Sequence, residues 1–313
     1  MKVVVLMSSY NGEKYIEQQI ESILSQNKMY KTVAGDVEHF DLEIFIRDDG
    51  SVDGTLHILE KYRKNGKLEY YSGNNMGSAN SFFEMMWKAP KADYYAFADQ
   101  DDYWLDVKIS RAISILENSD QYKPKVYGSN AKLVDEKLNR MGVCFYPKKF
   151  DPEFKLVSCS CGMLGCTMVF NDIFMELIRS HPKPVNAIMH DYYVTLLCCA
   201  VNGTVIFDDS AKILYRQHGR NVCGASSSTT KKIKNHIYSI MMKPKNSIFD
   251  QAQEMAEEFA DILPESNRKW LLRVGACKKS LLKRIMLAFS REYHFYSIKR
   301  AIPMRLRILI GKI

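Results

Sequence analysis

Four short apolar runs, each followed by an amphipathic stretch, fill the first 116 residues and limit the fold more than any other feature of the sequence. The runs, at residues 2–7, 42–47, 68–71 and 94–98, have the apolar character of buried strands. In the stretches between them, apolar residues recur at the three-to-four spacing of a helix face. Because strands that alternate with helices pair in parallel, the pattern predicts an α/β fold: an open, mostly parallel sheet with helices on both faces.

The rest of the chain divides into a less regular middle and a basic C-terminal part. Further strands are predicted near residues 125–133, 166–170 and 204–207, and helices near 172–180 and 190–201. The Ser- and Thr-rich residues 225–230 are typical of a linker. We therefore predict one α/β domain over residues 1–225, made of the halves 1–118 and 119–225, and a basic, amphipathic, helical tail over 226–313.

Positive charge is concentrated at the C-terminal end. The chain has 313 residues and a formal net charge of +8. From Arg268 to the end there are 13 Lys and Arg against one acid, Glu292, so this segment carries +12 and the first 267 residues carry −4. The asymmetry predicts an anionic partner for the tail, either a membrane surface or a nucleic acid.

The eight cysteines and the length of the apolar runs narrow the class of protein further. No two cysteines have C-x-x-C spacing, so we expect Cys159, Cys161 and Cys166 to be small buried residues rather than metal ligands. Apolar runs stay short of the ~18–20 residues that span a bilayer, and the N-terminus lacks the features of a signal peptide. We expect a cytoplasmic protein, or one on the cytosolic side of a membrane, with free thiols.

Polar and acidic side chains follow each of the four predicted strands. The carboxyl ends of parallel strands meet at one edge of a sheet, where the ligands of doubly wound folds bind. Asp, Asn and Gly are also ordinary turn and cap residues, so any one of these loops can instead be a simple turn. The residues concerned are Ser9, Tyr10, Asn11 and Gly12 after the first strand, Asp48 and Asp49 after the second, Asn75 and Gly77 after the third, and Asp99, Asp101 and Asp102 after the fourth.

The segment Asp99-Gln100-Asp101-Asp102 is harder to explain as a turn. Three acids within four positions repel one another unless a cation or hydrogen-bond donors meet them. Carboxylate oxygens on a loop beside a phosphate-bearing substrate suit Mg²⁺ or Mn²⁺. We therefore predict a divalent-cation site at this loop.

Together these segments resemble the family 2 glycosyltransferases of the GT-A fold. Residues 9–15, 48–55, 75–77 and 99–102 follow the family's order, and the resemblance extends over roughly residues 1–225. The chain is most similar to the bacterial branch that builds O-antigen, capsule or other cell-surface polysaccharide, including rhamnosyltransferase-like members. The resemblance implies a Rossmann-like nucleotide-binding half over 1–118 and an acceptor and catalytic half over 119–225.

The resemblance also implies roles for residues of the first half. Asp48 or Asp49 matches the acid that accepts the N3–H of a uracil or thymine base. Asp99 and Asp101 match an Asp-x-Asp pair, with Asp99 near the ribose and Asp101 on a Mn²⁺ or Mg²⁺ ion that bridges the diphosphate. The implied nucleotide-binding set is completed by Ser9, Tyr10, Asn11, Asn75 and Gly77.

Three further candidates in the second half come from the same resemblance. Asp191, in the pair His190-Asp191, matches the general base of inverting enzymes, which takes the proton of the acceptor hydroxyl; the alternative is a helix cap and nothing more. Arg216 matches a position that meets phosphate oxygens of the nucleotide. His218 matches a position that completes the metal shell, although a lone loop histidine is more often structural.

Residues 270–289 are the most amphipathic part of the basic tail. One interpretation is a single helix that lies on the anionic cytosolic leaflet of the membrane. The other is a helix packed on the catalytic domain with its charges in solvent. The apolar positions are Trp270, Val274, Cys277, Leu281, Leu282, Ile285, Met286 and Phe289.

Together with the basic tail, the resemblance thus implies an inverting, metal-dependent transferase that moves a single sugar from a UDP- or dTDP-sugar to a glycan, carried on a lipid at the inner face of the cell membrane. The lack of a Gln-x-x-Arg-Trp motif and of membrane spans argues against a processive synthase. Two alternatives stay open: a nucleic-acid-binding protein that uses the basic tail, and an inactive scaffold homologue. The negative body argues against the first, and intact Asp99, Asp101 and Asp191 argue against the second.

Overall fold

The computed structural model describes residues 1–146, 150–218, 246–292 and 298–311. The predicted linker at 225–230 and the predicted domain boundary after residue 225 lie outside the described residues. The chain divides into two compact units. Residues Met1–Phe150, Met163–Ser180 and Gly203–His218 form the first, which we call the sheet unit; Asp151–Gly162, His181–Asn202 and the described part of Gly219–Ile313 form the second, the helical unit.

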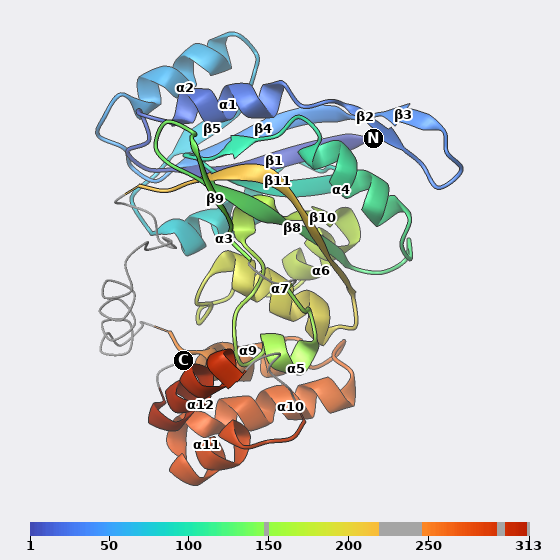
Figure 1. Ribbon diagram of the computed structural model, residues 1–313, viewed down its shortest axis with the longest axis vertical. Coiled ribbons are helices and arrows are strands. Elements are labelled where there is room, and N and C mark those ends of the chain that lie inside the picture. Colours follow the sequence, from blue (N-terminus) through green and yellow to red (C-terminus); the bar gives the residue numbers. More distant parts are fainter. Residues whose placement is uncertain (147–149, 219–245, 293–297, 312–313) are drawn as a thin grey trace. The chain divides into compact units, whose positions relative to one another are not determined.

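A nine-stranded mixed sheet is the centre of the sheet unit (Figure 1), with the strand order β5-β4-β1-β6-β10-β8-β11-β7 and β9 paired to β8. The first four strands in this order are parallel to one another, as the alternating pattern predicts. β10 is antiparallel to both of its neighbours. The strand bounds are β1 (Lys2–Ser9), β4 (Asp41–Asp48), β5 (Glu69–Ser72), β6 (Tyr94–Asp99), β7 (Tyr103–Trp104), β8 (Lys125–Val134), β9 (Arg140–Cys144), β10 (Val169–Asn171) and β11 (Thr204–Arg216).

Helices cover both faces of this sheet. α1 (Ile16–Leu24), α2 (Thr55–Lys64) and α4 (Lys108–Glu117) pack their apolar residues on one face, against alternate residues of β1 such as Val3 and Val5. α3 (Ser78–Lys88) and α6 (Asp172–Arg179) lie on the other face (Figure 1). Alternate residues of a strand point to opposite faces, so the fully buried runs of β1 and β6 supply both cores.

Several elements of the sheet unit differ from the sequence-based expectation. A hairpin of β2 (Met29–Lys31) and β3 (Val37–His39) fills a segment with no predicted strand, and residues 165–167 form a 3₁₀ turn before β10. β11 continues to Arg216, well beyond the predicted end at residue 207. Its register shifts between Asp208 and Ile213, and the polar residues there interrupt the apolar pattern on which the prediction depended.

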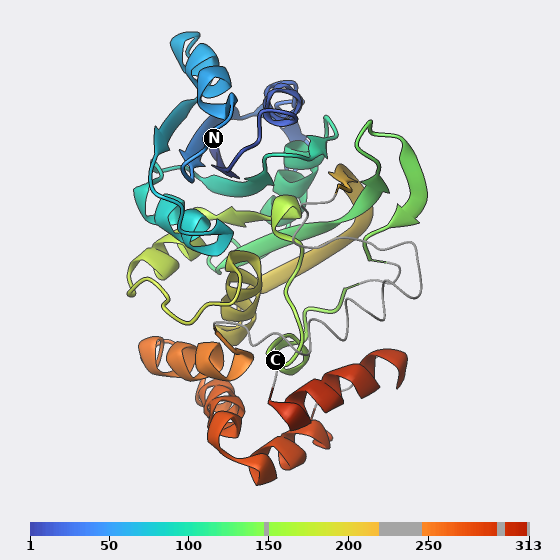
Figure 2. The same cartoon turned by 90° about the vertical axis from the view of Figure 1, so that its left-hand side faces the viewer.

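The helical unit contains α5 (Phe154–Val157), α7 (His190–Ala200), α9 (Ile248–Glu258), α10 (Glu265–Gly275), a 3₁₀ turn η2 (Ala276–Lys279), α11 (Leu281–Ala288) and α12 (Ile298–Ile310). Figure 2 shows α9 to α12 in orange and red. Trp270 of α10 is buried and donates its indole N–H to Ser158 Oγ at 2.7 Å, and Asn267 Nδ2 donates to the carbonyl of Ala200 at 2.8 Å. α10 therefore packs with α7 and the α5 segment.

Residues 270–289 form two helices rather than the single predicted one. Ser280 adopts an extended backbone (φ −141°, ψ 114°) and caps α11, because its Oγ accepts the N–H of Lys283. None of the helices in the described ranges is long and apolar enough to cross a bilayer. Among the predicted buried cysteines, Cys159 and Cys166 are buried, but the prediction is wrong for Cys161, which is exposed.

Candidate active site

Four loops of the sheet unit meet where the parallel strands end. In the register of the sheet, Ser9 lies opposite Asp48, Asp48 opposite Ser72, and Ser8 opposite Asp99. The strand ends therefore place the loops after β1, β4, β5 and β6 side by side. Of the site residues proposed from the sequence, all except Asp191 belong to this unit; Asp191 belongs to the helical unit.

Asp48 is fully buried and holds the neighbouring loops together. Its Oδ1 accepts the hydroxyls of Ser9 (3.0 Å) and Ser51 (2.5 Å). Its Oδ2 accepts the N–H groups of Gly50 (3.1 Å) and Ser51 (2.8 Å) and the hydroxyl of Ser72 (3.1 Å). A carboxylate that accepts five hydrogen bonds has no lone pair left for a further donor. Asp48 and Ser9 are therefore already bonded to groups within the protein.

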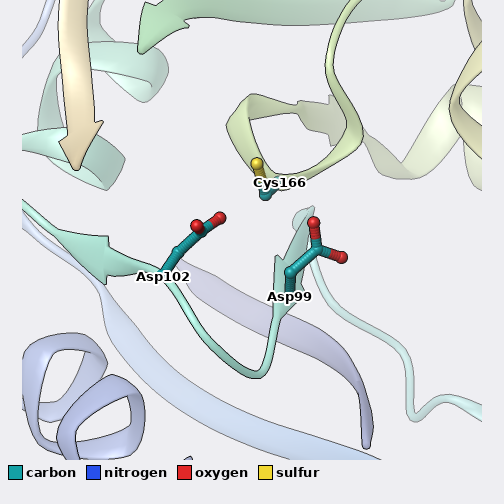
Figure 3. Close-up of side chains that lie close together, drawn as sticks. All are labelled: Asp99, Asp102 and Cys166. Carbon is teal, nitrogen blue, oxygen red and sulfur yellow. The ribbon is translucent and has the colours of Figure 1, made fainter. Parts of the chain in front are cut away.

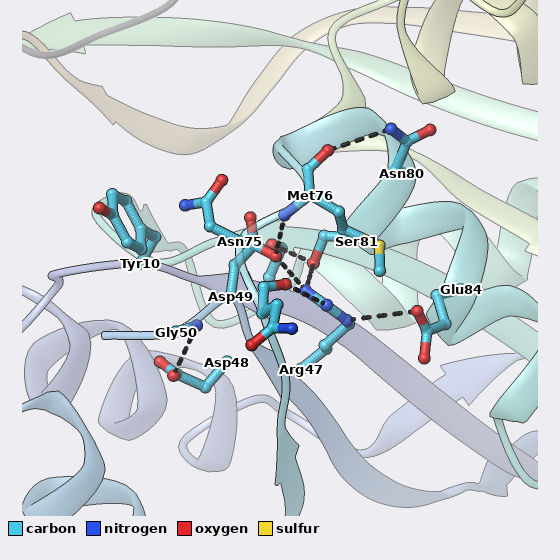
Figure 4. Close-up of polar contacts among 12 residues, drawn as sticks. Tyr10, Arg47, Asp48, Asp49, Gly50, Asn75, Met76, Asn80, Ser81 and Glu84 are labelled. Carbon is cyan, nitrogen blue, oxygen red and sulfur yellow. Dashed lines mark hydrogen bonds and ion pairs between the residues drawn. The ribbon is translucent and has the colours of Figure 1, made fainter. Parts of the chain in front are cut away.

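Asp49, the neighbouring acid, keeps capacity to accept a further hydrogen bond (Figure 4). It pairs with the buried guanidinium of Arg47, its Oδ1 accepts the N–H of Met76 (2.9 Å), and its Oδ2 accepts the N–H of Gly77 (2.9 Å). A buried charge requires such a partner, and Arg47 meets Glu84 as well (3.7 Å). Of the two acids that the sequence left open, Asp49 is the one whose Oδ2 accepts a single bond.

Tyr10 lies on the first loop, and its side chain is 47% exposed. Gln100, between the two acids of the Asp-x-Asp segment, fixes the backbone of Tyr10: Oε1 accepts the Tyr10 N–H (2.9 Å) and Nε2 donates to the Tyr10 carbonyl (3.0 Å). Gly12 leaves room for this amide, since a Cβ there would lie 2.2 Å from Gln100 Oε1. Sequence reasoning missed Gln100, and its place between two candidate ligands is the signal that was available.

Asn11 and Gly77 both have left-handed backbones that shape their loops. Asn11 (φ 48°) donates its N–H to Ser51 Oγ and accepts the N–H of Val52 at Oδ1, both at 2.9 Å. Gly77 (φ 82°) precedes α3, and its N–H is shared between Asp49 and Asn75 Oδ1 (3.2 Å). Asn75 itself is exposed. Asn11 and Gly77 thus set loop geometry, while Tyr10 and Asn75 present side chains to solvent.

Asp101 and His218 lie in contact, although 117 positions separate them in the sequence. His218 Nε2 is 2.7 Å from Asp101 Oδ2, and the imidazole stacks on the ring of Tyr15. Both side chains are mostly buried, with His218 9% and Asp101 17% exposed, so this pair is held in place by its surroundings. A carboxylate and an imidazole at this distance are two suitable ligands for one divalent cation.

Arg216, which the resemblance placed on phosphate oxygens, is buried against the same loop. Its Nε donates to the Asp101 carbonyl (2.7 Å), its NH2 to Gln18 Oε1 (2.6 Å), and its NH1 to the Glu136 carbonyl. Its backbone N–H donates to Asp102 Oδ1 (3.1 Å). Each guanidinium nitrogen therefore meets an acceptor of the protein, an arrangement that holds the acidic loop.

Asp99, Asp102 and Cys166 form a second cluster at this loop (Figure 3), with their ligand atoms within 4.8 Å of one another. Asp102 and Cys166 are fully buried, and burial raises the pKa of each well above its usual range. The nearby Lys108 ammonium is also buried, and burial lowers its pKa to about 7. Burial thus disfavours the charged forms of the Asp102 carboxyl and the Cys166 thiol, and a thiol is a poor ligand for a hard cation.

The donor set at the loop edge fits the divalent cation that the family implies. Asp101 offers carboxylate oxygens, and the imidazole Nε2 of His218 lies 2.7 Å from its Oδ2. These are ligands of Mn²⁺ and Mg²⁺ chemistry rather than of a thiolate site. Metal binding itself stays a prediction.

Asp191 lies in the first turn of α7, where the helix dipole stabilises a carboxylate. The helix begins at His190 and its N-cap is Met189, so Asp191 is not the cap residue. Its Oδ1 accepts the N–H of Tyr192 at 2.7 Å. His190 is buried, and burial lowers its pKa to about 3, so the imidazole is neutral at physiological pH.

Comparisons with known proteins agree with this architecture. The family model described as Glycosyl transferase family 2 matches residues 4–178. The dTDP-rhamnosyl transferase RfbG of Shigella flexneri is 29% identical over 244 residues, a match that covers 73% of this chain and 77% of that protein. The UDP-Glc:alpha-D-GlcNAc-diphosphoundecaprenol beta-1,3-glucosyltransferase WfaP of Escherichia coli is 33% identical over 171 residues, covering 54% of this chain and 60% of that protein.

Among solved structures, TarS of Staphylococcus aureus in complex with UDP-GlcNAc matches with a TM-score of 0.57 at 17% identity, covering 99% of this chain and 82% of that chain. This likeness confirms the predicted GT-A-type α/β fold, with its mostly parallel sheet flanked by helices. The family match spans more than half of the sequence and confirms the resemblance read from its motifs. The chain therefore belongs to glycosyl transferase family 2 and is a glycosyltransferase.

Proposed function

We propose that this glycosyltransferase moves a single sugar from a UDP- or dTDP-sugar to a glycan acceptor in the synthesis of cell-surface polysaccharide. The observation that carries the proposal is the contact between Asp101 and His218 on the loop after β6, at the edge where the parallel strands end. Relatives named for dTDP-rhamnosyl and UDP-glucosyl transfer support both donor classes. The carboxylates at this edge are suitable ligands for a divalent cation that binds the diphosphate of the donor.

The donor nucleotide binds across the loops of the first half. The exposed ring of Tyr10 is available to stack on the base, and Asp49 Oδ2 has capacity to accept the N3–H of uracil or thymine. Asn75 is exposed on the next loop and contributes a polar contact. The hydrogen bonds described above shape these loops and involve Ser9, Asn11, Asp48 and Gly77. Arg216 holds the acidic segment through the Asp101 carbonyl.

In this proposal Asp101 and His218 would hold a Mn²⁺ or Mg²⁺ ion, and Asp99 would lie near the ribose of the donor. A bound divalent cation neutralises the negative charge that grows on the leaving diphosphate. The contact between His218 and Asp101 orients the carboxylate, and Arg216 fixes the backbone carbonyl of the same residue. The loop is thus organised by the protein itself.

Asp191 acts as the general base. As the acceptor hydroxyl oxygen attacks the anomeric carbon, its proton passes to the Asp191 carboxylate and the bond from the sugar to the diphosphate oxygen breaks. The nucleoside diphosphate leaves on the opposite side, so the anomeric configuration inverts. The position of Asp191 in the first turn of α7 supports this role, because the positive end of the helix dipole interacts favourably with a carboxylate there.

The acceptor is a lipid-linked glycan, and the enzyme works as a peripheral protein on the inner face of the cell membrane. The name of the relative WfaP includes a diphosphoundecaprenol acceptor, and the C-terminal segment carries +12. The rival function, nucleic-acid binding through the basic tail, lacks a supporting feature in the first 267 residues, which carry −4.

A panel of nucleotide sugars tests the proposed donor. Thermal shift and release of nucleoside diphosphate are measured with UDP-, dTDP- and GDP-sugars, each with Mn²⁺, with Mg²⁺ and with EDTA. We expect stabilisation and turnover with a UDP- or dTDP-sugar only when the cation is present. Turnover with GDP-sugars alone, or undiminished turnover in EDTA, would contradict the proposal.

A further inference from the structure

We infer that the outer faces of α11 and α12 form a docking surface for an anionic lipid bilayer. We call this surface the lipid face and define it by the exposed apolar residues Leu281, Leu282, Ile285, Met286 and Phe289 of the α11 segment and Ile302, Leu306 and Ile310 of α12. The inference deepens the proposed function, on which it rests, by naming the part of the chain that meets the membrane.

The apolar residues of the α11 segment share one side of the helix. Leu281, Leu282, Ile285, Met286 and Phe289 are spaced as neighbours on successive turns, and they are between 42% and 68% exposed. Five large apolar side chains in nine residues are far more than scattered surface hydrophobics, and they form a contiguous patch. Such a patch marks a surface that meets another apolar phase.

The opposite side of α11 packs on the rest of the helical unit. The lipid face is therefore not the side of the helix that contributes to the core. Leu287 and Ala288 are fully buried. The Arg284 guanidinium donates to the carbonyls of Cys277 (2.9 Å) and Lys278 (2.7 Å), which ties α11 to the preceding turn. The orientation of the helix is therefore set by contacts, with its apolar patch turned outward.

α12 continues the same surface. Its Ile302, Leu306 and Ile310 recur every four residues and are about half exposed (47–54%), while Ile308 is buried. α11 and α12 pack together, and the Arg305 guanidinium lies over the ring of Phe289 at 5.9 Å. The two helices thus present apolar residues with a cation among them.

The charge around the lipid face favours an anionic bilayer over other occupants. Lys279, Lys283 and Arg291 are exposed at or beside α11. The acids in this region are already paired: Glu292 with Lys155 and Arg273, and Asp250 with Lys278. A basic helix with an apolar side is the pattern of interfacial helices, which insert apolar residues and attract anionic headgroups.

The other occupants fit less well. A second copy of the chain would bring the same basic surface, and like charges oppose one another across such an interface. A nucleic acid would meet the cations but leave the apolar side chains in water. A bilayer with anionic lipids satisfies both features at once.

The structure also changes which residues of the tail meet the membrane. Trp270, Val274 and Cys277, which the sequence grouped with the lipid-facing stripe, are buried inside the helical unit. The break at Ser280 separates this packed segment from the exposed one. The two interpretations of residues 270–289 thus each describe one part of the segment: packing up to Cys277, and exposure from Leu281 onward.

Co-sedimentation of the full-length protein with vesicles tests the inference. We compare phosphatidylcholine vesicles with vesicles of equal parts phosphatidylcholine and phosphatidylglycerol, at low salt and in 0.5 M NaCl, a condition about three times physiological ionic strength. We expect at least about tenfold stronger binding to the anionic vesicles, which weakens in high salt. Equal binding to both vesicles, or none to either, would overturn the inference.

A matched pair of variants locates the surface. Leu282→Glu combined with Phe289→Glu places two carboxylates in the lipid face and should abolish vesicle binding. Tyr122→Glu changes a still more exposed side chain of the sheet unit and should bind as the unchanged protein does. The bilayer is the wrong occupant if the double variant still binds vesicles, whether or not it also binds duplex DNA. It is also the wrong occupant if the double substitution converts a dimer to a monomer in analytical ultracentrifugation.

The nucleotide-dependent thermal shift of the double variant separates this inference from the proposed function. We expect the shift with donor and Mn²⁺ to be unchanged, because the substitutions lie on α11 and the donor loops lie in the sheet unit. Loss of vesicle binding with an intact nucleotide response supports the lipid face. Failure of the nucleotide response in the unchanged protein would count against the proposed function and leave the vesicle result standing.

Discussion

At the scale of single residues, hydrogen-bonding capacity separates acids that the sequence pattern treats alike. Asp48 and Asp49 are adjacent, and both precede the same glycine turn. The first accepts five hydrogen bonds inside the protein, and the second balances Arg47 with capacity left on Oδ2. Sequence alone cannot distinguish them, because the partners come from loops up to 39 positions away.

We predict that Asp48→Asn lowers the stability of the protein more than its catalysis. The amide replaces one accepting oxygen by a donor, so buried donors such as the Ser9 hydroxyl lose their acceptor, at a cost of roughly 1–3 kcal/mol. Urea unfolding measures this cost, with Asp36→Asn on the exposed hairpin as control. Unchanged unfolding together with weakened UDP or dTDP binding would instead show that Asp48 contacts the uracil or thymine base of the donor.

We predict that Asp101→Ala abolishes turnover and removes the effect of Mn²⁺ or Mg²⁺ on nucleotide binding. The substitution deletes the carboxylate that meets His218 but keeps the backbone carbonyl that Arg216 holds. Isothermal titration with nucleotide, with and without cation, measures the loss. Full activity of this variant, or full activity of the unchanged protein in EDTA, excludes a metal role for Asp101.

At the scale of elements, the segment that leads into α7 is held by α9. Glu254 accepts the N–H groups of Val185 (2.7 Å) and Asn186 (2.8 Å), and Gln251 Oε1 accepts the N–H of Ile188 (2.9 Å). Asn246 Nδ2 donates to the carbonyls of Val185 (3.2 Å) and Ala187 (3.0 Å). The C-terminal segment therefore fixes the backbone just before His190 and Asp191.

For Asp191→Asn we predict a loss of turnover on the order of 10² or more, the usual scale for a missing general base. Donor affinity should change little, because the base acts on the acceptor hydroxyl. Single-turnover kinetics with the donor dissociation constant measured in parallel checks both statements. A weaker donor complex with unchanged turnover per complex would give Asp191 a structural role.

For Glu254→Ala we predict faster hydrogen exchange at the amides of residues 185 and 186 and a turnover reduced on the order of tenfold. Small displacements of a reacting group have costs of this size or larger. Glu258→Ala, an exposed acid on the same helix, is the matched control. If exchange at the two amides is unaltered in Glu254→Ala, this carboxylate does not hold the segment.

At the scale of the whole molecule, the sequence was most informative where apolar periodicity was regular. The strands and helices of the first 116 residues appear close to their predicted places, and the polar residues at the strand ends meet as parallel pairing requires. The hairpin at β2 and β3, the long β11 and the break at Ser280 were not predictable, because tertiary contacts and local caps set them. The contacts of Arg216, Gln100 and Glu254 join segments distant in sequence and leave no local pattern.

The last prediction concerns how much of the C-terminal segment the fold requires. Phe249, Met255, Trp270 and Leu271 are at most 3% exposed in the helical unit, and each contributes about 1.5–3 kcal/mol by burial. A chain that ends at Ser227 loses all four, a loss comparable with the total stability of roughly 5–15 kcal/mol of a typical domain. We therefore expect this truncation to be insoluble or to lose cooperative thermal unfolding.

A chain that ends at Lys279 keeps α9 and α10 and removes the lipid face with α11 and α12. It should unfold cooperatively, keep the nucleotide-dependent thermal shift and no longer sediment with phosphatidylglycerol vesicles. Near-ultraviolet circular dichroism and calorimetry on both truncations make the comparison. A soluble, cooperatively folded chain ending at Ser227 would show that the protein folds without α9 and α10. It would also show that α7 does not need the side-chain contacts of α9 to residues 185–188 in order to fold.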